Sequence, residues 1–463
     1  MYLHWYEVAS IPEALVQVEV VSTDELGDRS YIAHDGELAL VIDPQRDIDR
    51  IEAVLADNSL RCVLVAETHI HNDYVSGGLE LARRTGATYL VAGADGVAFE
   101  RQSVSDGDEL TAGRLRITVV ATPGHTDGHL AYVVGDGEGP EVVFTGGSLL
   151  YGSVGRTDLV DPGRTDELTR AQYHSARHLA DLLADDVAVY PTHGFGSFCS
   201  SGSSSSDTES TIGVERGRND ALVADDEDAF VAVLVAGLTA FPSYYAHMGP
   251  HNQDGAGPID LSPPALTDPF GLARRIMDGE WVVDLRSTTA FAAEHLAGTI
   301  GIGLGQHFAT YLGWLIPWET PLTLIAETAE QITAAQRQLV RIGIDRPSGG
   351  AVGAPNELAE GSKLRSYPTA TFDDLAREPG AVVLDVRRDD ERATGHIPRS
   401  THIPLHALAD RLGDVPNGRL WVHCASGYRA GIAASLLDRA GRDVVLVDDD
   451  IEHAKGLMVD GHG

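Results

Sequence analysis

The chain has 463 residues, of which 69 are Asp or Glu and 34 are Lys or Arg, so its formal net charge is −35. That length exceeds what one domain normally holds. So acidic a surface repels nucleic acid and anionic membranes, and it keeps a protein soluble in concentrated salt, which suggests a halophilic source.

Three features indicate a cytoplasmic protein without a membrane span. Cys62, Cys199 and Cys424 provide no disulfide framework and favour a reducing compartment. The N-terminal residues lack the basic-then-apolar order of a signal peptide. Residues 298–318 contain no Asp, Glu, Lys or Arg, but five glycines and a proline make this stretch a poor membrane span.

The N-terminal part of the chain mixes predicted strands with predicted helices. Apolar or alternating runs predict strands at residues 16–20, 38–43, 62–66, 88–91, 115–121, 130–134, 142–144 and 187–190. Helices are predicted at residues 48–56 and 165–183. Glycine and proline in residues 255–264 predict a linker, so a first domain should occupy residues 1–260.

The first candidate site follows the predicted strand at residues 62–66. Two histidines and a carboxylate, His69, His71 and Asp73, are crowded at the carboxyl end of that strand, where loops carry sites rather than packing. Neutral imidazoles with one carboxylate suit zinc or iron well and suit magnesium or calcium poorly. Solvated loop histidines are the alternative interpretation of this pattern.

This motif resembles the signature of the metallo-β-lactamase fold family. His125 resembles the family's second histidine loop, and His193 resembles its last. Gly147 stands where the family usually has an aspartate, and Tyr74 stands where it usually has another histidine. Both of those family residues serve mainly a second metal ion. The resemblance implies a four-layer αββα sandwich that binds one metal ion per chain.

Two adjacent tyrosines, Tyr244 and Tyr245, lie near the end of this first segment. They could line a channel for the substrate. Aromatic packing explains them equally well.

The rest of the chain contains an internal repeat. Asp284 and Arg286 recur as Asp385 and Arg387, 101 residues later, and each pair ends an apolar run that predicts a strand. Repeats this long are duplicated domains rather than solenoid units. We therefore expect two further domains, at residues 265–350 and 362–463.

The second copy carries a candidate nucleophile. Residues 419–423 predict a strand, and the loop from Cys424 to Arg429 joins it to a predicted helix. Backbone N–H groups and the dipole at a helix N-terminus favour an anion, so Cys424 is placed to act as a nucleophilic thiolate. Arg429 could pair with an oxyanion or hold the loop. A buried, inert cysteine is the alternative interpretation.

The cysteine loop resembles the active loop of rhodanese domains, which is a cysteine, four residues and a basic or small residue. In the first copy, Glu327 stands about where the cysteine would be, so we expect residues 265–350 to serve packing or an interface. The fold class expected is therefore a multidomain α/β and α+β protein, in which an αββα metallo-β-lactamase-like sandwich precedes two rhodanese-like α/β domains.

This order of domains resembles the persulfide dioxygenase–rhodanese fusions. The resemblance implies that a low-molecular-weight thiol persulfide is oxidised to sulfite by O₂ at one non-haem iron. It also implies that sulfane sulfur, taken from a persulfide or from thiosulfate, passes through Cys424.

The resemblance also suggests the metal ligands. The family's iron is held by two histidines, which fall on His69 and His125, and by an aspartate, which falls on the glycine noted above. His71 would complete a three-histidine set, with His193 or Asp73 in a supporting role. Three histidines also suit catalytic zinc with an open fourth position, so zinc is the alternative to iron.

Two other functions fit the same motifs. One is a thioester hydrolase of the glyoxalase II type, in which a metal-activated water attacks the thioester, although that type normally needs two metal ions. The other is a sulfurtransferase whose metal-poor N-terminal domain only binds a ligand or builds an oligomer. The expected assembly is a homo-oligomer that binds no nucleic acid and no membrane.

Stability should rise with salt. The net charge of −35 creates self-repulsion, and salt screens it because the Debye length falls from about 10 Å at 0.1 M to about 3 Å at 1 M. We expect the melting temperature, followed by circular dichroism, to climb between these two conditions. A flat or falling trend would contradict the halophilic interpretation.

Overall fold

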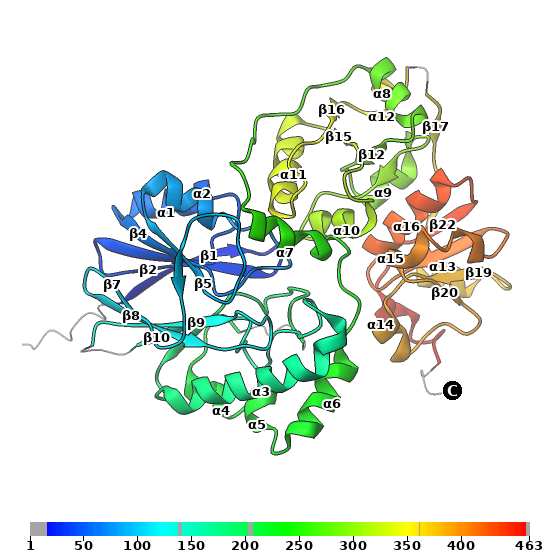
Figure 1. The fold of residues 1–463 in the computed structure, drawn as a ribbon. Coiled ribbons are helices and arrows are strands. Elements are labelled where there is room, and N and C mark those ends of the chain that lie inside the picture. The colour runs from blue at the N-terminus through cyan, green and yellow to red at the C-terminus, as the bar shows by residue number, and fades with distance from the viewer. Residues whose placement is uncertain (1–15, 138–140, 202–206, 361, 460–463) are drawn as a thin grey trace, which may run out of the picture. The chain divides into compact units, whose positions relative to one another are not determined.

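The structure is a computed structural model that describes residues 16–137, 141–201, 207–360 and 362–459 (Figure 1). The chain divides into two compact units. The first comprises Met1–Leu238 and Tyr245–Pro258, and the second comprises Thr239–Tyr244 and Ile259–Gly463. Among the described residues, no helix is long and apolar enough to cross a membrane.

The first unit is built on two sheets. Its strands are β1 (Gln17–Thr23), β2 (Asp28–His34), β3 (Leu38–Ile42), β4 (Arg61–Ala66), β5 (Thr88–Ala92), β6 (Gln102–Val104), β7 (Glu109–Ala112), β8 (Leu115–Ala121), β9 (Leu130–Gly135), β10 (Val142–Gly146) and β11 (Ala188–Pro191). The strand order is β1-β2-β3-β4-β5-β6 in one sheet and β11-β10-β9-β8-β7 in the other.

Helices connect or follow the strands of the first unit, and several of them cover the outer faces of the two sheets. They are α1 (Asp49–Asp57), α2 (Gly78–Thr85), η1 (Pro162–Arg164), α3 (Thr165–Leu182), α4 (Ile212–Arg216), α5 (Asp220–Val223), α6 (Glu227–Gly237) and α7 (Tyr245–Asp254). Ile51 of α1 and Leu81 of α2 share a buried cluster with the first sheet, and Leu179 of α3 and Phe230 of α6 share another with the second.

Alternation along the strands separates the cores. Leu40 and Ile42 of β3 face the second sheet and share a cluster with Ile117 of β8. Ala39 and Val41, the residues between and before them, face α1 and α2 instead, as expected for side chains that alternate along a strand. The layers therefore run helix, sheet, sheet, helix, and the predicted αββα sandwich is confirmed.

The topology gathers several loops at one edge of this sandwich. Strands β3, β4 and β5 are parallel, and so are β10 and β11. Asp43 follows β3, residues 67–73 follow β4, and His193 follows β11 closely. Loops at the carboxyl ends of parallel strands meet at the same edge, so segments distant in sequence are brought together there.

The second unit contains two parallel sheets. Its strands are β12 (Trp281–Asp284), β13 (His295–Leu296), β14 (Ile300–Gly301), β15 (Leu322–Ala326), β16 (Gly349–Val352), β17 (Leu364–Arg365), β18 (Thr369–Ala370), β19 (Val382–Asp385), β20 (Thr401–His402), β21 (Leu420–His423) and β22 (Val444–Val447). The strand orders are β14-β12-β15-β16 and β20-β19-β21-β22-β18. The order β14-β12-β15-β16 of the first sheet therefore corresponds to β20-β19-β21-β22 in the second. A short β13-β17 ladder lies apart from them.

The helices of the second unit alternate with these strands along the chain. They are α8 (Pro269–Met277), α9 (Thr288–Ala293), α10 (Phe308–Leu315), α11 (Ala329–Arg341), α12 (Pro355–Leu358), α13 (Phe372–Ala376), α14 (Asp389–Ala393), α15 (Leu405–Leu408), η2 (Leu412–Asp414), α16 (Tyr428–Arg439) and η3 (Ile451–Ala454). The helix expected after the cysteine loop is α16.

The strand register corrects one alignment of the two copies. Asp284 of β12 pairs with Ile325 of β15, and Asp385 of β19 pairs with His423 of β21. The next residue in each chain segment is Ala326 in the first copy and Cys424 in the second. The counterpart of the cysteine is therefore Ala326 rather than Glu327. The pairing of the strands fixes this position relative to Asp284 and Asp385, whereas the loop sequences alone do not fix it.

Candidate functional site

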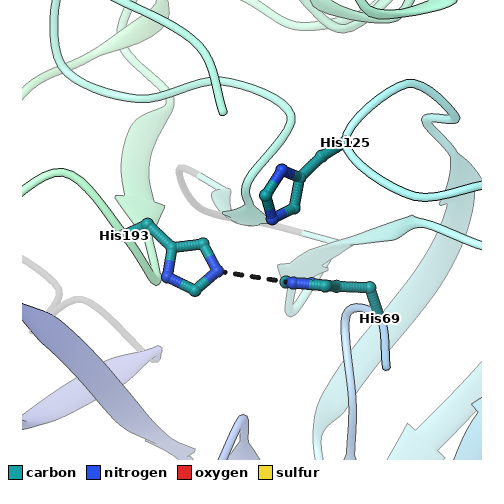
Figure 2. Close-up of side chains that lie close together, drawn as sticks. All are labelled: His69, His125 and His193. Atoms are coloured by element: carbon teal, nitrogen blue, oxygen red, sulfur yellow. Dashed lines mark hydrogen bonds between the residues drawn. The ribbon is translucent and has the colours of Figure 1, made fainter. Parts of the chain in front are cut away.

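Three buried histidines converge at the carboxyl edge of the sandwich. His69 lies beyond β4, His125 beyond β8 and His193 beyond β11. One ring nitrogen from each lies within 4.8 Å of the others. Figure 2 shows the three rings turned toward one another, with the Nε2 atoms of His193 and His69 3.4 Å apart.

The opposite nitrogen of each ring is held by a neighbour. His125 Nδ1 lies 2.6 Å from the carbonyl oxygen of Arg156, so it donates its proton there. His69 Nδ1 lies 2.9 Å from Oγ1 of Thr68. That hydroxyl donates to Asp43 at 2.7 Å, and its oxygen therefore accepts a hydrogen bond from the Nδ1–H of His69.

His193 is held more strongly than the other two. Its Nδ1 lies 2.9 Å from Asp28 and 3.2 Å from Asp73, both buried carboxylates. Burial lowers the pKa of His193, but Asp73 and Asp28 outweigh that effect and raise it to about 10. The pKa of His125 falls to about 3, mainly because the ring is buried.

These outer hydrogen bonds turn the Nε2 lone pairs inward. His125 Nε2 is buried and has no hydrogen-bond partner among the described residues. Lone pairs that face one another in a dry pocket repel, and a metal ion that accepts all of them removes the repulsion. A metal ion binding here would replace the inward proton of His193. The residues present therefore fit a metal ion, although nothing in the geometry selects iron or zinc.

His71 is placed differently from the expectation that it completes the set. Its Nε2 lies 3.2 Å from Asp43, 3.3 Å from Glu67 and 3.0 Å from the hydroxyl of Tyr74. Burial lowers its pKa, but the two carboxylates raise it to about 9, so the ring carries a proton. His193 and not His71 lies with His69 and His125, although His71 could also share an ion with Asp73 and His193.

The sequence interpretation overlooked two residues beside this cluster. The ring of His129 stacks on that of His69 at 4.9 Å and accepts a hydrogen bond of 2.9 Å from the backbone N–H of Gly147. Its position four residues after His125, in the same loop, was the available signal. Cys199 is fully buried, and burial followed by Asp73 raises its pKa.

Gly147 lies directly under the ring of His125. A Cβ atom at position 147 would lie 2.7 Å from Cγ and 3.0 Å from Nε2 of His125, closer than real side chains approach. The ring thus occupies the space that an aspartate side chain would enter.

A cavity of about 520 Å³ borders the histidine loops. It is lined by Ile70 and Asn72 from the first loop, Thr126 from the second, and Tyr245 of α7. Tyr244 does not line it, because it belongs to the second unit and packs there against Gly313. Of the two tyrosines, only Tyr245 is therefore near the histidines.

The cysteine loop forms a second site, between β21 and α16. Cys424 is 1% exposed. Gly427 has a φ of 88° and lies so close to Asp448 that a Cβ there would be 3.2 Å from its Cα. Arg429 forms a two-fold ion pair with Glu391, at 2.5 and 2.6 Å, and so holds the loop from within the protein.

Comparison with known proteins identifies both parts of the chain. Residues 25–193 match the model of the metallo-beta-lactamase superfamily, and residues 369–455 match that of the rhodanese-like domain. The mitochondrial persulfide dioxygenase of Bos taurus is 30% identical over 211 residues, which is 45% of this chain and 74% of that protein. The chain belongs to the metallo-beta-lactamase superfamily.

Another curated relative and a solved structure bear different names. The hydroxyacylglutathione hydrolase of Parasynechococcus marenigrum is also 30% identical, over 45% of this chain and 78% of that protein. A solved metallo-beta-lactamase from Staphylococcus aureus is 26% identical, covers 74% of this chain and 100% of its own, and superposes with a TM-score of 0.66. The predicted fusion of a metallo-beta-lactamase domain with a rhodanese-like domain is thus confirmed, whereas the ligand and nucleophile assignments stay predictions.

In this metallo-beta-lactamase domain, Gly147→Asp should weaken metal binding. The new side chain has no room beside His125, and such overpacking costs about 1–3 kcal/mol of stability. After reconstitution with Fe(II), we expect elemental analysis to find less than half of the wild-type metal per chain. Gly217→Ala is the control, because a Cβ there meets only a carbonyl oxygen at 3.6 Å. More metal in Gly147→Asp than in wild type would contradict the steric argument.

Proposed function

We propose that the chain oxidises a low-molecular-weight thiol persulfide at one metal ion in its metallo-beta-lactamase domain and transfers sulfane sulfur through Cys424. The observation that carries the proposal is the inward convergence of the Nε2 atoms of His69, His125 and His193. The similarity to a protein named persulfide dioxygenase supports the substrate class.

The metal we propose is iron, one per chain, with zinc as the alternative. Iron bound to these histidines would supply the redox chemistry with O₂ that sulfur oxidation requires. Three neutral imidazoles would leave the charge of such an ion uncompensated, and an anionic persulfide would then be attracted to the site. Asp28 and Asp73 hold Nδ1 of His193, so that its Nε2 faces the position of the proposed metal ion.

The cavity beside the histidines is the proposed place for the organic part of the substrate. It is bordered by the residues next to His69 and His125, and Tyr245 forms part of its wall. Its volume of about 520 Å³ is in the range of small-molecule sites. Burial of all three histidines keeps bulk water away from the reacting sulfur.

In the rhodanese-like domain, we propose that Cys424 carries sulfur as a persulfide. The Cys424 thiolate attacks the outer sulfur of a persulfide or of thiosulfate. The S–S bond of the donor breaks, and the thiolate or sulfite leaves with the electron pair. An acceptor thiolate then attacks the outer sulfur on Cys424 and regenerates its thiolate. Arg429, paired with Glu391, keeps the loop in shape for both steps.

We propose domain boundaries at residues 1–260, 265–350 and 362–463. The change of compact unit at Ile259 supports the first boundary. Like strand orders in the two sheets of the second unit support the duplication. With Ala326 at the cysteine position, residues 265–350 contain no cysteine.

Two alternatives are kept because particular observations favour them. The similarity to a hydroxyacylglutathione hydrolase favours thioester hydrolysis. The family's aspartate is absent at Gly147, which favours a sulfurtransferase with a metal-poor N-terminal domain.

The metal content of the protein separates these functions. We expect wild-type protein purified without oxygen to hold about one iron per chain and to consume O₂ when a persulfide is added. His193→Ala should lose most of the metal, because one of three ligands is removed. His174→Ala, an exposed histidine of α3, is the control. Zinc with thioester hydrolysis and no O₂ uptake would favour the hydrolase, and protein that stays metal-free with Fe(II) and Zn(II) would leave only the sulfurtransferase.

Cys424 should take up one sulfur atom. Incubation with thiosulfate or a persulfide donor, followed by intact-protein mass spectrometry, should show one added sulfur in the wild type and none in Cys424→Ser. Cys62→Ser is the control, because burial raises the pKa of that thiol to about 11 and keeps it inert. Equal labelling of Cys424→Ser and the wild type would place the sulfur on another cysteine.

A further inference from the structure

The cysteine loop is covered by a segment of the middle domain. The hydroxyl of Tyr428 donates a hydrogen bond of 2.9 Å to the carbonyl oxygen of Gly303. The ring of Tyr311, on α10, lies 5.9 Å from that of Tyr428, and the ring of His307 lies 6.3 Å from it. Tyr428 is four residues after Cys424, so these groups of the first copy stand beside the loop of the second.

Close packing holds this wall in place. The ring of Trp314 stacks on that of His406 at 5.0 Å, which joins α10 to α15. A Cβ at Gly431 of α16 would lie 2.6 Å from Cβ of Thr288, so only glycine permits this approach. These five contacts leave little freedom for the wall to move away from the loop.

Two polar groups on this wall have no internal partner. Among the described residues, neither the hydroxyl of Tyr311 nor the ring of His307 forms a hydrogen bond, and both side chains reach solvent. The charged and nucleophilic groups that lie close enough to interact electrostatically with the Tyr311 hydroxyl are Arg429, Arg388, Glu391 and Cys424. Arg429 also acts on His307.

The charge of the wall suits an anionic donor. The chain has 69 acidic residues, yet residues 298–318, which include both groups, contain none. An acidic side chain here would repel thiosulfate from Cys424. Residues 298–318 are unsuited to a membrane span. Their lack of acidic side chains instead fits a position beside the binding site of an anionic donor.

We propose that the site of Cys424 is shared by both copies, and that Tyr311 and His307 of the cysteine-less copy bind the oxyanion end of thiosulfate. The hydroxyl and ring N–H donate to the sulfonate oxygens while Cys424 attacks the outer sulfur. The S–S bond breaks, sulfite departs with the electron pair, and its growing charge stays against the same donors. The inference rests on the proposed role of Cys424.

Donor-specific kinetics test this inference. Tyr311→Phe should raise KM for thiosulfate about tenfold, the effect of losing a hydrogen bond to a charged group. Turnover at saturating thiosulfate should stay within about twofold, because removing a binding contact raises KM and leaves kcat. KM for 2-hydroxyethyl persulfide should not change, since that donor has no sulfonate. Tyr367→Phe is the control, because it removes a tyrosine hydroxyl of the same unit that is buried and lacks a partner among the described residues.

Each other result overturns the inference. Unchanged KM for thiosulfate in both Tyr311→Phe and His307→Gln would remove the shared site and leave Cys424 as the carrier. Equal losses with both donors would mean that Tyr311 only supports the fold. If Tyr311→Phe fails to fold, His307→Gln, a change at an exposed side chain, decides alone. Wild-type protein that takes no sulfur on Cys424 would end the proposed transfer and this inference together.

Discussion

The candidate metal centre depends on one buried carboxylate, that of Asp43. It accepts hydrogen bonds from the backbone N–H of Thr68 at 2.7 Å, from its hydroxyl at 2.7 Å, and from the hydroxyl of Thr192 at 2.5 Å. Thr68 precedes His69 and Thr192 precedes His193, so one side chain ties together two loops that are distant in sequence. Burial raises the pKa of Asp43, but His71 and these hydrogen bonds outweigh it and keep the group ionised.

The same region concentrates buried charge. His193 lies between Asp28 and Asp73, and His71 lies between Asp43 and Glu67. Ionised groups are buried only when they are paired. Asp73 and Asp43 are paired with His193 and His71, whereas burial, followed by Asp73, raises the pKa of Asp28 to about 7, and burial also raises the pKa of Glu67. These contacts fix the ring orientations around the three converging nitrogen atoms.

The two copies of the internal repeat differ at the position of the cysteine. The first copy has Ala326 where the second has Cys424, yet its residues stand against the cysteine loop through Gly303 and Tyr311. The loop itself depends on Gly427, whose backbone conformation and contact with Asp448 exclude a side chain. The first copy therefore contacts the cysteine loop of the second without having a cysteine at this position itself.

The sequence by itself determined a mixture of strands and helices, the repeat, and the loops on which His69, His125, His193 and Cys424 lie, whereas the layers of the sandwich were implied by the family resemblance. These features are local, because hydrophobic alternation sets strands and their faces, and a short motif after a strand sets a loop. The helix predicted at residues 165–183 appears as α3, Thr165–Leu182, for the same reason.

Only the tertiary structure decided which of these residues meet. His71 lies two residues after His69 and its ring is 4.1 Å from that of His69, but its Nε2 is turned to Asp43 and Glu67, whose distance from it in space no local pattern reveals. His193 takes its place because parallel strand pairing brings β11 and its loop to the same edge. The alignment of Ala326 with Cys424 likewise needed the sheet register. Long-range pairing and buried electrostatics set these contacts, and neither is written in the spacing of residues along the chain.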